Sequence, residues 1–376
     1  MLSQPPLWLI LIAFVLTIGP LVFIHELGHY LVGRWFGVGA EVFSIGFGHE
    51  VTGWTDKRGT RWKVGWLPLG GYVRFVGDEH AASQPANPGS VAPEDRERSF
   101  HLKPVWQRFL IVLAGPVSNF LIAIAIFATL FAIYGVPRSP PIASAVVEGS
   151  AADHAGIRPG DLIVSAGGRR IDSFETLSRY VSMRPGEQVD IALTRSNEKL
   201  TVPVRFDSEQ ETDRFGNRFR VGRLGVYSNQ RVLEPVSALQ LIPAATMFTL
   251  TTTRSMLEGI WQIVTGRRSV KELGGPLKIA QVAGQQASLG LLEFVQLVAL
   301  ISINLGFINL LPVPMLDGGH LLFYSIEAVQ RRPVSVRAQE WAFRGGLALI
   351  LALFVFTTFN DLGSLGLWRG LERLIG

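Results

Sequence analysis

The sequence contains no cysteine, and it is short of charged residues. Without thiols the chain forms no disulfide, and any metal site must use nitrogen and oxygen ligands. Only 17% of the 376 residues are charged, whereas 48% are hydrophobic, and the mean hydropathy is +0.30. This balance is too apolar for a soluble protein and too charged for a chain that lies wholly in lipid. We therefore expect an integral membrane protein with an extramembrane domain.

Two further absences narrow the class. The net charge is only +5, and the basic residues gather near the predicted membrane boundaries instead of forming a stripe with interleaved aromatics, which argues against a nucleic-acid partner. Residues 1–6 carry no positive charge, and no small-residue cleavage site follows the first apolar stretch. We expect this stretch to be a retained span and not a removable signal peptide.

The first predicted span, within residues 1–36, ends in a metal-binding pattern. Leu7–Ile24 is uncharged, and His25-Glu26-Leu27-Gly28-His29 follows directly. Two histidines four residues apart lie about 40° apart around a helix, so both reach one zinc ion, while Glu26 can act on a metal-bound water. A chance match or a histidine-capped helix end is the alternative. Ionisable groups inside a span are costly and usually functional, so the placement favours a metal site.

A third ligand is expected from the third, broken transmembrane segment, residues 290–330. Residues 294–316 are uncharged, but Pro312 and Pro314 interrupt the helix just before Asp317. Irregular backbone at membrane depth is tolerated only where protein or a water-filled cavity covers it. Hydrolytic zinc sites keep three protein ligands and one water, and Asp317 would complete the set; a helix cap is its alternative role. His320 is expected to support the site as a donor from outside the ligand set, and a spare ligand is its alternative role.

Residues 37–104 are predicted to form a cytoplasmic-side, membrane-associated β-loop, with short strands and a mobile stretch over residues 81–97. Glycines in a strand let another backbone approach closely. Gly46, Phe47 and Gly48 are therefore predicted to position an extended substrate by strand addition at a Ser44–Gly48 edge. A hairpin that merely rests on the membrane is the alternative.

The second predicted span covers residues 105–137, and its uncharged run, residues 109–137, contains one amide, Asn119. An amide in lipid needs a polar neighbour. Asn119 would either orient a substrate carbonyl or hold the active-site helices together, and plain packing is equally compatible with the pattern.

Residues 138–230 change to a soluble pattern of strands and short helices. The run Ala155-Gly156 to Gly160-Asp161 with Ile163 resembles a bacterial PDZ domain, a fold that accepts peptide C-termini or extended segments beside a strand and a helix. His154 is expected to be a surface residue of this module. Residues 207–223 are too short and too charged for a second copy.

The remaining segments complete the predicted topology. Residues 231–289 are expected to form an amphipathic surface helix and a connector, and residues 331–376 a basic loop, the fourth transmembrane helix and a C-terminal tail. Basic loops favour the cytoplasmic side, which puts both termini and the PDZ domain in the periplasm and the metal site towards the cytoplasm. The predicted fold is thus an α-helical polytopic membrane protein with four transmembrane helices, an inserted α+β PDZ domain and a β-hairpin loop.

These motifs together resemble the site-two protease family of intramembrane zinc metalloproteases, in its bacterial regulator-of-sigma-E branch. The resemblance covers nearly the whole chain and rests on five segments: the HExxH pentapeptide, Gly115-Pro116 with Asn119, the PDZ insert, Gly275-Pro276-Leu277-Lys278-Ile279 and Asn309–Gly319. The chain departs from the best-known branch by having one PDZ domain instead of two.

The resemblance implies a function and a set of roles. Zn²⁺ would be bound by His25, His29 and Asp317, Glu26 would be the general base, and Asn309 would help to position the substrate. The Gly46-Phe47-Gly48 segment would belong to a membrane-associated β-loop. The implied substrates are single-span proteins of the bacterial inner membrane, with anti-sigma factors and remnant signal peptides as candidates.

Two other classes use some of the same residues. A membrane zinc transporter also needs intramembrane histidines and a carboxylate, but not a glutamate beside a ligand or a peptide-binding domain. A non-catalytic PDZ scaffold would not need an intact ligand set and base.

Overall fold

The computed structural model describes residues 5–78, 93–212, 218–229, 232–266, 269–270 and 274–364. The chain divides into two compact units, one made of residues 1–127 with 245–376 and the other of residues 128–244. Residues 81–92 of the expected mobile loop and the tail after residue 364 lie outside the described residues, and Pro93–Arg98 forms the 3-10 helix η1.

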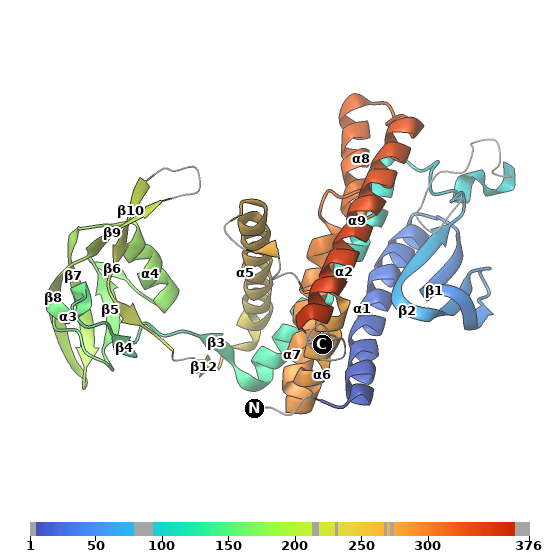
Figure 1. Ribbon diagram of the computed structural model, residues 1–376. Coiled ribbons are helices and arrows are strands. Elements are labelled where there is room, and N and C mark those ends of the chain that lie inside the picture. The colour runs from blue at the N-terminus through green and yellow to red at the C-terminus, as the bar shows by residue number, and fades with distance from the viewer. Residues whose placement is uncertain are drawn as a thin grey trace, which may run out of the picture. The chain divides into compact units, whose positions relative to one another are not determined.

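Four helices in the described part of the chain are long and apolar enough to cross a membrane. They are α1 (Leu7–Trp35), α2 (Val105–Tyr134), α7 (Leu291–Asn309) and α9 (Val336–Ser364) (Figure 1). Their number agrees with the predicted four spans. The fourth helix, α9, is longer than its uncharged stretch because charged residues extend it at the N-terminal end. There, Glu340 Oε2 lies 3.8 Å from Arg344 Nη2, one turn further along the helix.

The third span breaks where two prolines predicted a break. Helix α7 ends at Asn309, and α8 (Asp317–Gln330) begins at Asp317. The loop between them, residues 310–316, contains Met315 with a φ of +82°. Asp317 thus stands at the first residue of a helix, directly after an irregular segment.

Two helices directly precede α7 in the sequence. Helix α5 (Ala238–Val264) coincides with the predicted amphipathic helix. Helix α6 (Pro276–Leu289) occupies what was expected to be only a connector, and it packs against α1. Its N-terminus is capped by Asp361 of α9, whose carboxylate accepts hydrogen bonds from the backbone N–H groups of Gly275 (3.1 Å) and Lys278 (2.9 Å). Because Asp361 is far from α6 in the sequence, no local sequence pattern predicted this cap.

The β-loop is a hairpin of two long antiparallel strands, β1 (Ala40–Thr55) and β2 (Arg61–Phe75), instead of several short ones. Ser44 has Cα partners on both sides, Tyr72 and Lys63, and its neighbour Ile45 likewise pairs twice. The free edge expected at Ser44 is therefore absent. A Cβ atom at Gly46 would lie 2.7 Å from the Leu67 carbonyl oxygen, so the close backbone approach predicted there is made by β2 itself.

Aromatic rings fasten this hairpin to α1. Tyr30 of α1 lies edge-on to Phe43 at 5.8 Å, and Phe43 stacks on Trp62 at 4.3 Å between ring centroids. Such contacts add to the apolar burial that holds β1 and β2 beside the histidine-bearing helix.

The unit of residues 128–244 is an α+β domain. Its antiparallel sheet has the order β6-β5-β7-β8 and packs α4 (Phe174–Ser182) over an apolar core that includes Ile163, Leu177 and Ile191. The strands are β3 (Val136–Arg138), β4 (Ala145–Val146), β5 (Leu162–Ala166), β6 (Arg169–Arg170), β7 (Gln188–Arg195), β8 (Glu198–Arg205), β9 (Asp207–Thr212), β10 (Arg218–Arg223), β11 (Val226–Tyr227) and β12 (Val232–Glu234), with α3 (Ala151–His154). His154 is exposed, as expected.

Among the described residues of this domain, Asp161 is a buried carboxylate with an ion-pair partner. The Arg195 guanidinium donates to both carboxylate oxygens of Asp161, at 2.8 and 2.7 Å, and the Arg158 backbone N–H donates at 2.8 Å. Burial by itself raises the pKa of Asp161, but these hydrogen bonds outweigh burial and hold that pKa below its usual value.

Candidate metal centre

Helix α1 brings two imidazoles to one face and buries them. The Nε2 atoms of His25 and His29 lie 3.3 Å apart, and their rings meet edge to face at 4.9 Å. Residues four apart on a helix share a face, so the spacing in the sequence is sufficient to produce this pair.

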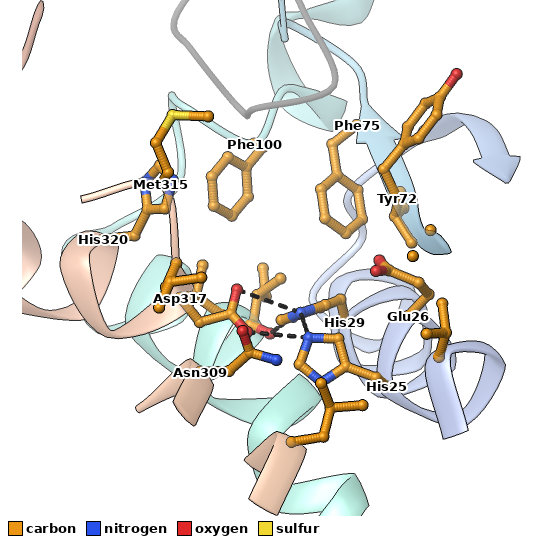
Figure 2. Close-up of a pocket in the computed structure, with 18 of the residues that line it drawn as sticks. His25, Glu26, His29, Tyr72, Phe75, Phe100, Asn309, Met315, Asp317 and His320 are labelled. Atoms are coloured by element: carbon orange, nitrogen blue, oxygen red, sulfur yellow. Dashed lines mark hydrogen bonds and ion pairs between the residues drawn. The ribbon is translucent and has the colours of Figure 1, made fainter. Parts of the chain in front are cut away.

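Asp317 completes the group from the start of α8. Its Oδ2 lies 3.0 Å from His25 Nε2 and its Oδ1 3.5 Å from His29 Nε2 (Figure 2). One donor atom from each of the three residues lies within 4.8 Å of the others. Figure 2 places Glu26 on the other side of the histidines from Asp317.

Hydrogen-bond partners at the Nδ1 atoms fix the orientation of the two imidazole rings. His29 Nδ1 lies 2.9 Å from the Ile111 carbonyl oxygen, so Nδ1 carries the proton and Nε2 offers its lone pair. His25 Nδ1 lies 3.0 Å from the Asn119 amide nitrogen, while the Asn119 Oδ1 is buried without a hydrogen bond. Turning the amide by 180° lets Oδ1 accept from His25 Nδ1–H, which leaves His25 Nε2 unprotonated as well.

This arrangement fits a zinc ion. Two imidazole lone pairs and a carboxylate converge at hydrogen-bonding distance, and the buried Asp317 Oδ2 accepts no hydrogen bond. Such a cluster of acceptors is repulsive unless a cation lies among them. Two nitrogen ligands and one oxygen ligand form a donor set that catalytic zinc uses, with a further position left for water or substrate.

A cavity of about 370 Å³ opens over the group and contains Glu26, which is buried and accepts a hydrogen bond from the Val73 backbone N–H. Asn309 and Phe47 line the same cavity, at the positions predicted for substrate contact. His320 lies on its wall, outside the donor group and beside Phe343, with ring centroids 5.2 Å apart.

The other predicted substrate-positioning residues lie away from the cavity lining. Gly46 and Gly48 have positive φ angles and lie against β2. Asn119 is fully buried behind His25, and its own carbonyl oxygen accepts a hydrogen bond from the Ser302 hydroxyl of α7 at 2.7 Å. Of the roles considered for Asn119, which were orienting a carbonyl, holding the helices together and plain packing, these hydrogen bonds favour holding the helices together.

Comparison with known proteins agrees with this site. The model of Peptidase family M50 matches residues 13–353. The chain belongs to peptidase family M50. Membership confirms the resemblance to site-two proteases drawn from the motifs, and with the four apolar helices it makes the chain a multi-pass membrane protein.

Relatives of this M50 chain carry related names. A protein of Agrobacterium fabrum named "Putative zinc metalloprotease Atu1380" is 45% identical over 364 residues, which cover 94% of this chain and 96% of that protein. A similarly named zinc metalloprotease of Rhizobium meliloti, R01501, is 43% identical over 94% of this chain and 95% of its own length. "Metalloprotease MmpA" of Caulobacter vibrioides is 37% identical over 96% of this chain and 97% of its own. Zinc, predicted as the cofactor, is confirmed.

The M50 site also depends on contacts that the sequence did not specify. A Cβ atom at Gly115 of α2 would overlap the His29 imidazole, so only glycine leaves room for that ring. The Ile111 carbonyl and the Val73 N–H act through the backbone, which no side-chain pattern reports. The signal in the sequence was the position of Gly115 inside the second apolar run. A glycine in a helix interior lowers stability by about 1 kcal/mol relative to alanine, so its presence there indicates a packing or functional role.

Proposed function

We propose that this M50 peptidase hydrolyses peptide bonds within or near the transmembrane segments of single-span membrane proteins. The observation that carries the proposal is the His25, His29 and Asp317 group with the buried Glu26 beside it, which lies among helices long enough to span a membrane. A substrate that reaches this group has to arrive from the lipid or from the membrane surface.

The proposed roles follow from the positions. His25, His29 and Asp317 hold the zinc, which when bound supplies a Lewis acid for the scissile carbonyl and activates water. Glu26 takes the proton from the attacking water on its carboxylate and delivers it to the leaving amine. The Val73 N–H holds the Glu26 carboxylate in place, and Asn309 on the cavity wall helps to position the substrate.

The substrate segment is proposed to unwind and pair with β2. A helical peptide bond is shielded by its own hydrogen bonds, and the freed backbone groups need new partners in lipid. Gly70–Val73 of β2 lines the cavity, and Gly71, Tyr72 and Val73 pair with β1 on one side only. This stretch of β2 replaces the Ser44–Gly48 edge as the proposed site of strand addition.

Cross-linking can test this pairing, because the chain has no cysteine. Single cysteines would be placed at Tyr72 and along the substrate segment, in a Glu26→Gln background that keeps the substrate intact. Disulfides at every second substrate position support a strand. A period of three to four positions would show a bound helix and refute strand addition.

The unit of residues 128–244 is proposed to be a periplasmic PDZ domain that docks an already trimmed substrate or acts as a size filter. A cavity of about 290 Å³ lies between α4 and residues 221–227, the kind of helix–strand groove that takes an extended peptide. Ser178→Trp, which fills this cavity, should abolish binding of apolar C-terminal peptides to the full chain. Arg179→Trp on the same helix lies outside the lining and serves as the control; equal binding by both variants would refute the groove as the site.

The proposed location is the bacterial inner membrane, with both termini and residues 128–244 in the periplasm and the zinc towards the cytoplasm. Support comes from Arg331 and Arg332 between α8 and α9, together with Arg337 and Arg344 in the N-terminal part of α9, since basic segments beside a span favour the cytoplasmic side. Labelling of single cysteines by an impermeant maleimide reports the orientation, and modification of residue 332 from the periplasm would reverse it.

Co-expression with tagged single-span proteins tests the activity directly. The unaltered chain should release a shortened product, whereas Glu26→Gln should release none while its purified form keeps its zinc. Full cleavage by Glu26→Gln would refute the assigned base. If the unaltered chain cleaves no substrate and zinc enters vesicles that contain it, a transporter is favoured instead.

A further inference from the structure

The loop that delivers Asp317 rests directly on α9. Gly346 is buried, and a Cβ atom there would overlap the Pro314 carbonyl oxygen and lie 2.9 Å from its carbonyl carbon. Its neighbour Gly345 is exposed, and a Cβ atom there would meet nothing within 4 Å. The loop backbone and the helix therefore touch at a position that has room only for glycine.

The same loop holds a backbone conformation that needs support. Met315, two residues before Asp317, has a φ of +82°, in the left-handed region that residues other than glycine rarely adopt. A strained residue persists only where its surroundings fix it. The loop's own bond from Leu316 N–H to the Val313 carbonyl (3.1 Å) is local, so the contact at Gly346 supplies a restraint from outside the loop.

A second contact holds the helix that follows Asp317. Phe343 precedes Gly346 by three residues and so lies on nearly the same face of α9. It is 5% exposed, and its ring lies 5.2 Å from His320 and 5.9 Å from Phe323 of α8, between ring centroids. Helix α9 thus contacts the chain on both sides of Asp317.

The far end of α9 is connected to the histidines. The buried Asp361 caps α6 through the N–H groups of Gly275 and Lys278. Helix α6 in turn lies against α1, where a Cβ atom at Gly284 would be 2.6 Å from the Ile10 side chain. One helix therefore touches the aspartate loop directly and the histidine helix through α6.

We infer that α9 is a brace for the zinc site, and that Gly346 and Phe343 are positioning residues that set the distance between Asp317 and the two histidines. This inference rests on the proposed role of Asp317 as a zinc ligand, but not on proteolysis. Residues that orient ligands from outside change metal affinity by about 10–100-fold when they are altered, without touching the metal themselves.

The test compares Gly346→Ala with Gly345→Ala in the full chain in detergent. Zinc affinity is measured by competition with a chromogenic chelator, and the geometry by the visible absorption of the cobalt-substituted protein. Gly346→Ala should bind zinc at least tenfold more weakly and change the cobalt spectrum, while Gly345→Ala should match the unaltered chain in both. Equal affinity and spectra for all three proteins would overturn the brace.

A second variant covers the case in which Gly346→Ala does not fold. Phe343→Leu removes ring contacts without adding bulk, and it should also weaken zinc binding while the thermal transition remains cooperative; unchanged affinity would again overturn the inference. Asp317→Ala tests whether Asp317 is a zinc ligand, the premise on which the brace depends. If it binds zinc as tightly as the unaltered chain, the proposed ligand set is wrong and the brace falls with it, whereas a chain that binds zinc as expected but cleaves no substrate refutes the protease and leaves the brace standing.

Discussion

The two units of this protein place polar and apolar side chains in opposite ways. In residues 128–244, an apolar core fills the space between sheet and helices. In the four long helices, only 17% to 33% of the residues in the most apolar stretches are buried, whereas His25, Glu26, Asn119 and Ser302 are almost completely covered. Lipid is as apolar as leucine, so apolar burial does not drive these helices together.

The difference shows where each unit keeps its specificity. The unit of residues 1–127 and 245–376 depends on close backbone contacts and hydrogen bonds, such as Ser302 to the Asn119 backbone carbonyl (2.7 Å) and Ser118 to the Ile24 carbonyl (2.9 Å). Those contacts also assemble the metal site. The α+β domain depends on its apolar core and on the pair between the buried Asp161 and Arg195. Damage to helix contacts should therefore affect zinc first, and damage to the α+β domain should affect stability first.

The largest effect is expected at Gly115. Gly115→Ala puts a methyl group where the His29 ring lies, and displacing a ligand by about 1 Å can cost about 100-fold in rate. We expect less than stoichiometric zinc in the purified variant and at least that loss of cleavage. Gly19→Ala in α1, where a Cβ atom meets nothing within 4 Å, is the control and should retain both. Full zinc in Gly115→Ala would break the proposed link between helix contact and metal.

A smaller effect is expected at Asn119. Asn119→Leu removes the acceptor for His25 Nδ1–H and should weaken zinc binding by about 10–100-fold. Asn119→Asp keeps an acceptor at the same place, and we expect it to bind zinc more tightly than the leucine variant. Chelator competition on both variants checks the order. The reverse order would mean that the amide donates to His25.

In the α+β domain, Arg195→Gln should lower the free energy of unfolding by about 1.5–3 kcal/mol, because it leaves the buried Asp161 carboxylate with fewer donors. Arg170→Gln, from an exposed pair with Asp172, should change it by less than about 0.5 kcal/mol. Hydrogen exchange of peptides from β5 and β7 in the full chain measures both. Zinc content should not change in either variant, and a loss of zinc in Arg195→Gln would contradict the separation of the two units.

The smallest effect is a dependence on pH. Because the pKa of Asp161 is lowered in the folded domain, its pairing stabilises the fold above its unfolded pKa of about 3.9, and this contribution is lost as the pH falls through the folded value. Exchange protection of β5 should therefore exceed that of an Asp161→Asn variant at pH 7, and the difference should shrink below about pH 4. A difference that stays constant down to pH 3 would show that the carboxylate charge is not the cause.

Much of the site follows from local spacing. His25 and His29 share a helix face because they are four residues apart, and Pro312 and Pro314 end α7 before Asp317. Membership of family M50 agrees with what these motifs implied. The failures lie in pairing: the glycines at 46 and 48 suggested a free edge, but β2 occupies both sides of Ser44.

By itself, the sequence determined the apolar spans, the histidine pair, the break before Asp317 and the absence of thiol ligands, because each of these depends on residues close together in the chain. Tertiary structure alone decided that Ile111 orients His29, that Gly115 makes room for it, that β2 faces the cavity and that α9 contacts the loop before Asp317. These contacts join backbone atoms and glycines far apart in the sequence, and neither leaves a side-chain pattern that could be recognised before the helices pack.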